Sequence, residues 1–272
     1  MRFDNRRKQF RSILNGDRCV YPGSVFDPIS ARIAEDIGFE VGMFAGSIAS
    51  FTVLGAPDVI VLTLSEFAQQ AQRINRSSEL PLMVDADHGY GNALNVKRTV
   101  EELEMAGVSG MSIEDTELPQ PFGSVGRTKL LSIPEGVGKM KAALDGRQDP
   151  NLIIAGRTSA PGVTNMEDAL ERAMAYEKVG VDAIFLVGVK TKEQLEKISD
   201  AISIPIILGG GGSSDMMDLD YLSAKNVRIC LQGHQPFSAA VKAIYDTMKA
   251  LREGTPTEEL QGIASAELMG KV

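Results

Sequence analysis

Cysteine and long apolar runs are scarce in this 272-residue sequence, and basic residues are fewer than acidic ones. Cys19 and Cys230 stand in separate apolar stretches without the spacing of a metal-binding motif. Two cysteines cannot build a disulfide framework, so buried thiols in a reducing compartment are expected. No stretch approaches the ~20 apolar residues of a membrane span, and the charged residues 1–11 contain no apolar targeting segment. We therefore expect a cytoplasmic protein that does not associate with membranes.

The charge balance limits the classes of molecule that the protein is expected to bind. The sequence has 28 Lys and Arg against 36 Asp and Glu, a net charge of −8. Non-specific nucleic-acid binding needs a basic face, so it is not expected. A small anionic substrate remains compatible, because local charge can oppose the global sign. With 43% hydrophobic residues, the sequence predicts an ordered core, and residues 1–272 are expected to form one barrel-sized domain.

Short β-branched runs alternate with longer helical patterns along nearly the whole chain. Most runs are continuously apolar, which is typical of parallel strands covered on both faces. An α/β fold follows, and eight runs favour a (β/α)₈ TIM-type barrel over an open doubly wound sheet, which shows the same alternation. The predicted strands are residues 20–26, 40–45, 80–85, 110–114, 152–155, 183–189, 204–208 and 227–231.

Local signals mark the helix ends. Gly38, Gly107 and Gly180 each precede a predicted strand and are expected to stop a helix in the left-handed conformation. Thr164 and Glu167 have the spacing of a capping box, which predicts that a helix begins there.

Carboxylates follow two neighbouring predicted strands. Asp85 and Asp87 end the third run and point the same way, because side chains alternate along a strand. Glu114 ends the fourth run. Active sites of barrels lie at these strand ends, and carboxylate oxygens are ligands that Mg²⁺ prefers. Any one of these acids alone is more typical of a helix cap or a lysine pair. Three that converge favour a metal site.

At these residues the chain resembles the isocitrate lyase and phosphoenolpyruvate mutase superfamily, with its oxaloacetate decarboxylase branch as the nearest match. The DADHGYG stretch at residues 85–91 is the most specific motif. The resemblance spans roughly residues 25–237, and its other parts are residues 26–31, 46–50, 57–58 and 112–115.

The resemblance implies a Mg²⁺ site with Asp85 as the direct ligand. It further implies that Ser47 and the backbone N–H of Ile48 bind the 2-oxo acid end of a small substrate. The bound metal would draw off the negative charge that appears when a C–C bond breaks. The acids expected to hold the metal's waters are Asp58, Asp87 and Glu114.

Two further residues are candidates for the catalytic and substrate-binding set. Arg157 follows the fifth run, and its guanidinium can clamp a carboxylate or an enolate oxygen. The alternative for Arg157 is an ordinary surface arginine. His234 follows the eighth run and resembles a substrate-binding residue of the decarboxylase branch. The other histidine, His88, is expected to shape its loop through hydrogen bonds.

Residues 118–124, Leu-Pro-Gln-Pro-Phe-Gly-Ser, depart from other branches of the superfamily. Lyases that split isocitrate carry a Lys-x-Cys-Gly-His motif there, and phosphonate-forming members carry Lys and Asn. Decarboxylation needs only an electron sink, so it fits the sparse set of acids and bases. The main hypothesis is therefore a Mg²⁺-dependent decarboxylase or C–C lyase for a small 2-oxo dicarboxylate, converting oxaloacetate to pyruvate and CO₂.

Two alternatives stay open. The run of four glycines from Gly209 to Gly212 stands where we associate the decarboxylase branch with a tyrosine. Glycine-rich loops after the last strands of a barrel can bind phosphate, which favours phosphonopyruvate or phosphoenolpyruvate chemistry. The second alternative is a catalytically silent barrel that binds an acid.

The C-terminal stretch is more than a barrel needs. Residues 239–251 are amphipathic, residues 253–255 break the pattern, and Pro256 fits the first position of a terminal helix over residues 257–269. This helix either packs on its own barrel or, as the resemblance implies, exchanges between subunits of a homotetramer built as a dimer of dimers. Its apolar residues at helical spacing are Leu260, Ile263, Ala264 and Leu268.

Overall fold

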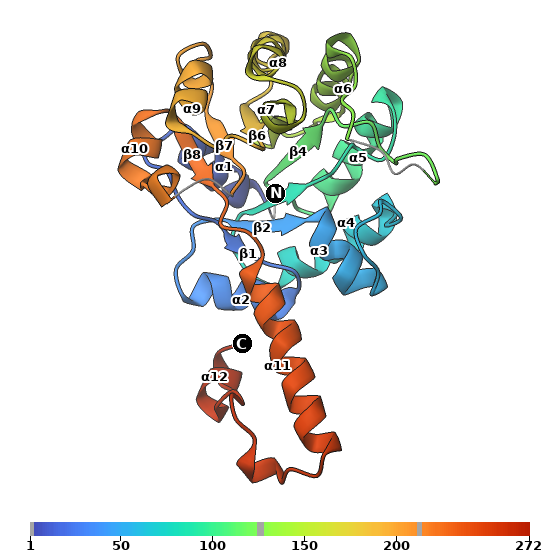
Figure 1. The fold of residues 1–272 in the computed structure, drawn as a ribbon, viewed down its shortest axis with the longest axis vertical. Helices are drawn as coiled ribbons and strands as arrows, with labels where there is room; N and C mark the ends of the chain where they lie inside the picture. Colours follow the sequence, from blue (N-terminus) through green and yellow to red (C-terminus); the bar gives the residue numbers. More distant parts are fainter. Residues whose placement is uncertain (1–2, 124–127, 211–213) are drawn as a thin grey trace.

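The computed structural model describes residues 3–123, 128–210 and 214–272, which form an eight-stranded parallel sheet (Figure 1). The strands pair in sequence order, and a parallel bridge between Val20 and Ile229 brings the last strand back to the first. This confirms the predicted (β/α)₈ barrel, because an open doubly wound sheet reverses its strand order. The strands are β1 Gly23–Ser24, β2 Gly42–Ala45, β3 Leu82–Asp85, β4 Gly110–Glu114, β5 Ile153–Thr158, β6 Ala183–Leu186, β7 Ile206–Leu208 and β8 Val227–Cys230.

All eight predicted strands are present, with two informative differences in their bounds. β1 has only two residues, because Pro22 lacks the N–H that would continue the ladder from the Val20 bridge. β5 runs three residues beyond its predicted end at residue 155. Arg157 therefore lies inside a strand, paired with Glu114 on β4, and not directly after it.

Helices connect the strands and cover the sheet. Their bounds are α1 Asp4–Leu14, α2 Pro28–Asp36, α3 Gly46–Ala49, α4 Leu64–Ser77, α5 Ala93–Met105, α6 Ile133–Gly146, α7 Ala160–Val163, α8 Met166–Val179, α9 Lys192–Ser199, α10 Leu219–Ala224, α11 Gln235–Arg252 and α12 Ala266–Lys271. A π-helical turn, η1, spans Ser50–Leu54, and short 3₁₀ turns span Ser214–Met217 (η2) and Thr257–Glu259 (η3). None of these helices combines the length and apolar character that crossing a membrane requires.

The helix-stop predictions are confirmed, and the capping prediction is wrong by one residue. Gly38, Gly107 and Gly180 have φ values of 87°, 89° and 101°, in the left-handed region. The cap of α8 is Asn165, whose side chain accepts from the Asp168 N–H over 2.8 Å. The Thr164 hydroxyl instead donates to the Asp168 carboxylate over 2.6 Å.

The core has an inner and an outer part. The outer part packs the strands against the surrounding helices. The inner part fills the barrel, and α1 contributes Phe10 and Leu14 to it. Gly110 on β4 makes room for α1, because a Cβ there would lie 2.2 Å from the Phe10 ring. α1 thus covers the N-terminal end of the barrel and leaves the C-terminal ends of the strands for the site. Cys19 and Cys230 are buried free thiols, as expected.

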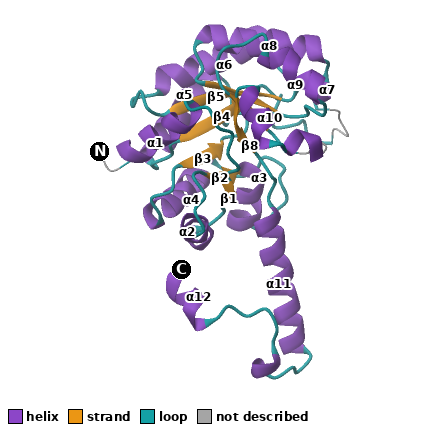
Figure 2. Ribbon diagram, turned by 90° about the vertical axis from the view of Figure 1, so that its left-hand side faces the viewer, coloured by secondary structure: helices purple, strands orange, loops and turns teal. Residues whose placement is uncertain are grey.

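The C-terminal arm, residues 235–272, extends away from the barrel (Figures 1 and 2). α11 has no buried residue, and its apolar side chains Val241, Ile244, Tyr245 and Met248 are exposed. The prediction of a continuous helix from Pro256 to residue 269 is wrong. Pro256 is extended at ψ 144° and Gly262 is left-handed at φ 71°, so only η3 and α12 form.

Candidate active site

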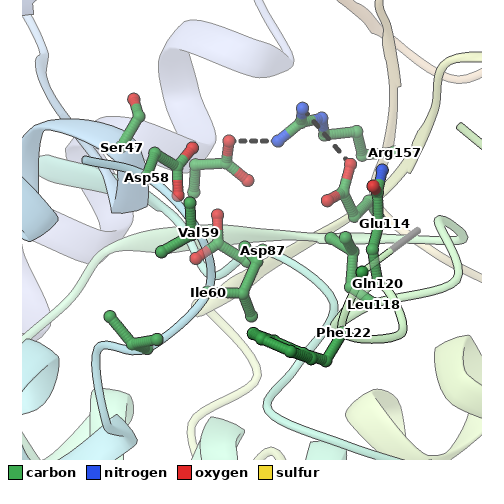
Figure 3. Close-up of a pocket in the computed structure, with 13 residues that line it drawn as sticks. Ser47, Asp58, Val59, Ile60, Asp87, Glu114, Leu118, Gln120, Phe122 and Arg157 are labelled. Atoms are coloured by element: carbon green, nitrogen blue, oxygen red, sulfur yellow. Dashed lines mark hydrogen bonds and ion pairs between the residues drawn. The ribbon is translucent and has the colours of Figure 1, made fainter. Parts of the chain in front are cut away.

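A cavity of about 750 Å³ lies at the C-terminal ends of the strands (Figure 3). Strands β3, β4 and β5, the start of α3 and the loop of residues 55–63 each contribute polar side chains to its wall. Six of the eight residues predicted for the site meet here: Ser47, Asp58, Asp85, Asp87, Glu114 and Arg157.

Arg157 links the acids of two strands. One terminal nitrogen, Nη1, donates to Oδ2 of Asp85, and the other, Nη2, lies 3.2 Å from Oε2 of Glu114. The Ser112 hydroxyl donates to the remaining oxygen of Asp85, Oδ1, over 2.9 Å. The register explains these contacts, because Asp85 pairs with Ser112 across β3 and β4, and Glu114 with Arg157 across β4 and β5. The guanidinium is therefore held in place by two carboxylates.

Asp87 reaches the same cavity through an unusual backbone conformation. Its φ of 47° lies in the left-handed region, which Asp adopts more readily than most residues. This turn aims the carboxylate at the start of α3, where a Cβ on Gly46 would lie 2.3 Å from Oδ2. The Asp87 carbonyl accepts from the Glu114 N–H over 2.9 Å and so ties the turn to β4.

Negative charge in the cavity exceeds what one guanidinium balances. Burial and the Asp85 carboxylate raise the pKa of Asp87 well above its ordinary value. The same two causes raise the pKa of Asp58. Burial also raises the pKa of Glu114, although Arg157 works against it. Each shift means that these carboxylates need additional positive charge nearby to ionise together.

A hydrated divalent cation fits this donor set. Within residues 3–123, 128–210 and 214–272, no three Asp, Glu, His or Cys side chains converge tightly enough to chelate an ion by themselves. Mg²⁺ does not require such a cage, since it keeps several waters and takes only one or two carboxylates directly. Oxygen donors and an excess of negative charge are both present among the cavity residues.

Ile48 and His234 are the predicted site residues that are not among the residues lining this cavity. The Ile48 side chain is buried within α3, where it is 6% exposed. His234 precedes α11, with Nδ1 2.8 Å from the Ser24 hydroxyl at the end of β1. Burial lowers the pKa of His234, and the Asp85 carboxylate partly offsets this effect. His234 is therefore held against the end of β1, outside the lining of the cavity.

Apolar residues complete the walls, and sequence reasoning missed them. Val59 and Ile60 follow Asp58, while Leu118 and Phe122 stand across the cavity on the loop after β4 (Figure 3). Residues 118–124 follow Glu114 and Asp115 closely in the sequence, and this position was the available signal that they lie at the site. Ser124 lies outside the described residues. Ile60 has a φ of 59°, rare for a β-branched residue, and nothing in the sequence marks it.

His88 was expected to shape its loop through hydrogen bonds, and the hydrogen bond that it makes to Lys139 comes from its backbone. Its carbonyl accepts from the buried Lys139 ammonium over 2.7 Å. Its ring nitrogen Nδ1 has no hydrogen-bond partner among the described residues. Burial, together with Lys139, lowers the pKa of His88 to about 4. The histidine is thus neutral and fixes the loop through its main chain.

Asp115, the last residue of the Ser112–Asp115 motif, points away from the cavity. It is fully buried and accepts from Arg172 Nη1 over 2.9 Å and from the Tyr176 hydroxyl over 2.6 Å, both on α8. The two neighbouring acids therefore have different roles: Glu114 lines the cavity, and Asp115 anchors α8 to the end of β4.

The glycine run is only partly described. The Gly209 N–H donates to the Leu186 carbonyl over 2.7 Å, and a Cβ on Gly210 would lie 2.4 Å from the Leu231 carbonyl oxygen. Both glycines thus permit close backbone packing. Gly211, Gly212 and Ser213, on which the phosphate-binding alternative depends, lie outside the described residues.

A family model described as phosphoenolpyruvate phosphomutase matches residues 10–252. The chain belongs to this family. The superfamily resemblance carried by residues 85–91 is thereby confirmed.

Relatives and solved structures of the family cover nearly the whole chain. An oxaloacetate decarboxylase of Rhodopseudomonas palustris (strain BisB18) is 58% identical over 269 residues, which cover 99% of this chain and 93% of the relative. An oxaloacetate acetylhydrolase in complex with the inhibitor 3,3-difluorooxalacetate superimposes with a TM-score of 0.87 at 28% identity, covering 98% and 93% of the two chains. A phosphonopyruvate hydrolase complex with oxalate and Mg²⁺ superimposes with a TM-score of 0.84 at 27% identity, and the match covers 97% of this chain and 95% of the hydrolase.

Proposed function

We propose that this chain is a Mg²⁺-dependent oxaloacetate decarboxylase that releases CO₂ and forms pyruvate through its enolate. The observation that carries the proposal is one cavity holding four carboxylates and a guanidinium clamped between two of them. The full-length relative named oxaloacetate decarboxylase supports the choice of reaction.

The carboxylates would hold the metal in two ways. Asp85 is the proposed direct ligand, and Asp58, Asp87 and Glu114 would bind the waters around the ion. When bound, Mg²⁺ supplies a Lewis acid that stabilises negative charge on the 2-oxo oxygen of the substrate. The related phosphonopyruvate hydrolase, described with oxalate and Mg²⁺, supports this choice of cofactor.

The chain's own residues would orient the substrate. Ser47 and the Ile48 N–H are proposed to bind the carboxylate next to the 2-oxo group, and His234 is proposed to contact the rest of the molecule. Arg157 would place its positive charge beside the oxygen that becomes the enolate. Because Asp85 and Glu114 already hold the guanidinium, little reorganisation accompanies the reaction, which favours stabilisation of the developing charge.

The reaction itself breaks one bond. The bond between C3 and the departing carboxylate opens, its electron pair moves toward the 2-oxo oxygen, and CO₂ leaves. A proton from solvent then adds to C3 and gives pyruvate. The apolar side chains of Val59, Ile60, Leu118 and Phe122 line the space in which a charged carboxylate would become neutral CO₂.

Steady-state kinetics test the proposal. Oxaloacetate is expected to be turned over with Mg²⁺ and not in EDTA, after subtraction of the spontaneous rate measured with the same Mg²⁺ concentration. Alkylmalates and phosphonopyruvate serve as competing substrates. Preferential turnover of phosphonopyruvate would replace decarboxylation with phosphonate chemistry. Turnover of no substrate would support the silent, acid-binding barrel.

We also propose that the protein works in the cytoplasm as a homotetramer, a dimer of dimers. Each subunit would be one barrel domain, residues 1–272, with its terminal helix exchanged with a neighbour. The exposed apolar side chains of α11 and of Ile263 and Leu268 support this assembly, since a neighbouring subunit would cover them.

A further inference from the structure

Thr116 lies just beyond β4, two residues after Glu114. Because side chains alternate along an extended backbone, Thr116 is on the same side of the chain as Glu114, and Asp115 is on the other. The backbone of Thr116 forms an antiparallel bridge with Leu130, and the side chain is buried, with 5% of the residue exposed. The bridge fixes where the threonine stands relative to the end of the strand.

The Thr116 hydroxyl contacts the carboxylate of Glu114. Its Oγ1 donates to Oε2 of Glu114 over 3.0 Å. Arg157 Nη2 meets the same oxygen over 3.2 Å. Two donors from different elements therefore converge on one oxygen of a carboxylate that could otherwise rotate about three side-chain bonds. Such convergence restrains the position of this oxygen and thereby the orientation of the carboxylate, as partners beyond the direct ligands commonly do around a metal.

We propose that Thr116 is a positioning residue for the reaction, whose hydroxyl holds the Glu114 carboxylate in the orientation needed for the Mg²⁺ waters and Arg157. Thr116 is not among the residues that line the cavity, so it acts through Glu114 and not on the substrate. This inference rests on the Mg²⁺ site of the proposed function.

Two pairs of variants isolate the hydroxyl. The wild-type threonine and the valine of Thr116→Val have nearly the same shape, but only the threonine has a hydroxyl that can donate to Glu114. The serine of Thr116→Ser and the alanine of Thr116→Ala form a second such pair, in which only the serine can donate. Calorimetric titration with Mg²⁺ is expected to show about tenfold weaker binding for the Val and Ala variants, the lower end of the range for such partners. Thr116→Ser should keep the wild-type affinity. The kcat for oxaloacetate should likewise fall in the Val and Ala variants and stay at the wild-type value in the Ser variant, while KM changes less than kcat.

Ser199→Ala is the control for loss of a half-buried, hydrogen-bonded hydroxyl far from the cavity. Ser199 ends α9, at the opposite end of the barrel, and its Oγ donates to the Lys225 carbonyl over 2.9 Å. This variant should bind Mg²⁺ like the wild type. Melting temperatures of all variants show whether a change reflects folding, and the Ser and Ala pair retains the comparison if the Val variant does not fold.

The results of these experiments distinguish a failure of the Thr116 proposal from a failure of the proposed function. A wild-type protein that neither binds Mg²⁺ nor decarboxylates oxaloacetate would remove the proposed function itself. If the wild type does both, equal Mg²⁺ affinities in the Val, Ala and Ser variants would overturn the role of Thr116. Equal losses in the Ser and Ala variants would overturn it as well, because the hydroxyl would then not be the group that matters.

Discussion

A Cβ atom on Gly46 would lie 2.3 Å from Oδ2 of Asp87, closer than non-bonded atoms can approach. Gly46 is the first residue of α3, directly after β2, and Asp87 follows β3. The two neighbouring strand ends thus fit together only when one of them carries no side chain. This steric requirement makes the position of the Asp87 carboxylate testable without changing the acid itself.

Gly46→Ala should displace the Asp87 carboxylate while leaving the fold intact, since Gly46 is not among the glycines with positive φ. We expect Mg²⁺ affinity to fall by ~10–100-fold, as for loss of a residue that holds the metal's waters. Calorimetric titration measures this. The control is Gly138→Ala in α6, where a Cβ would meet nothing within 4 Å. It should leave Mg²⁺ binding unchanged and stabilise the helix by about 0.5–1 kcal/mol. Wild-type affinity in Gly46→Ala would contradict the proposed role of Asp87.

Replacing the acids one at a time should rank their contributions to Mg²⁺ binding. Asp85→Ala is expected to abolish activity, because it removes the one proposed direct ligand and leaves Arg157 with a single carboxylate partner. Asp87→Ala and Glu114→Ala should weaken Mg²⁺ binding less, by ~10–100-fold. Titration of Mg²⁺ into the three variants checks the order. Asp85→Ala binding Mg²⁺ as tightly as the wild type does would refute the assignment.

Oxalate, a planar mimic of the pyruvate enolate, should compete with oxaloacetate only when Mg²⁺ is present. Arg157→Lys should lose most of this affinity, because one ammonium cannot reproduce a fork that meets Asp85 and Glu114 with separate nitrogens. Calorimetric titration with oxalate, in Mg²⁺ and in EDTA, measures the affinity in both conditions without requiring turnover. Equal oxalate affinity in both conditions would show that the acid cluster does not form the binding site.

The strand ends explain why so much of the site was predictable. Asp85, Glu114 and Arg157 follow or lie in apolar runs whose carboxyl ends meet at one edge of the barrel, so their order in the sequence already implies proximity. The missed residues depend on loop conformation. Ile60 faces the cavity through a left-handed backbone, and Leu118 does so from a long loop, neither of which has a periodic signal.

Two errors in the fold prediction have local causes. Residues 257–269 have helical spacing of apolar side chains, yet Gly262 adopts the left-handed conformation and the stretch does not form one helix. Thr164 has the spacing of a cap, but the neighbouring Asn165 takes that position. In both cases periodicity identified the segment, while the backbone conformation of single residues decided where helices begin and end.

Asp115→Asn should destabilise the protein without touching the cavity. Asp115 is fully buried and pairs with Arg172 and Tyr176, so its loss leaves a buried guanidinium with one fewer partner. We expect a loss of about 3 kcal/mol, the lower end for a broken buried pair, because Asp168 still contacts Arg172. Denaturant unfolding measures it. The control, Asp246→Asn, breaks an exposed pair with Lys242 on α11 and should cost about 0–1 kcal/mol. Equal effects of the two changes would contradict the anchoring role.

Deleting residues from Pro256 onward should lower the oligomeric state. Ile263 and Leu268 are 58% and 45% exposed in the single chain, and α11 presents a further apolar face. If these surfaces cover a neighbouring subunit, the truncated chain leaves that subunit's apolar surface open, and its melting temperature should fall. Light scattering on the full-length and truncated chains gives the subunit count. Ile263→Asp is a milder variant that retains the chain length and should weaken assembly in the same direction. The same subunit count and the same melting behaviour in all three proteins would show that the terminal segment takes no part in assembly.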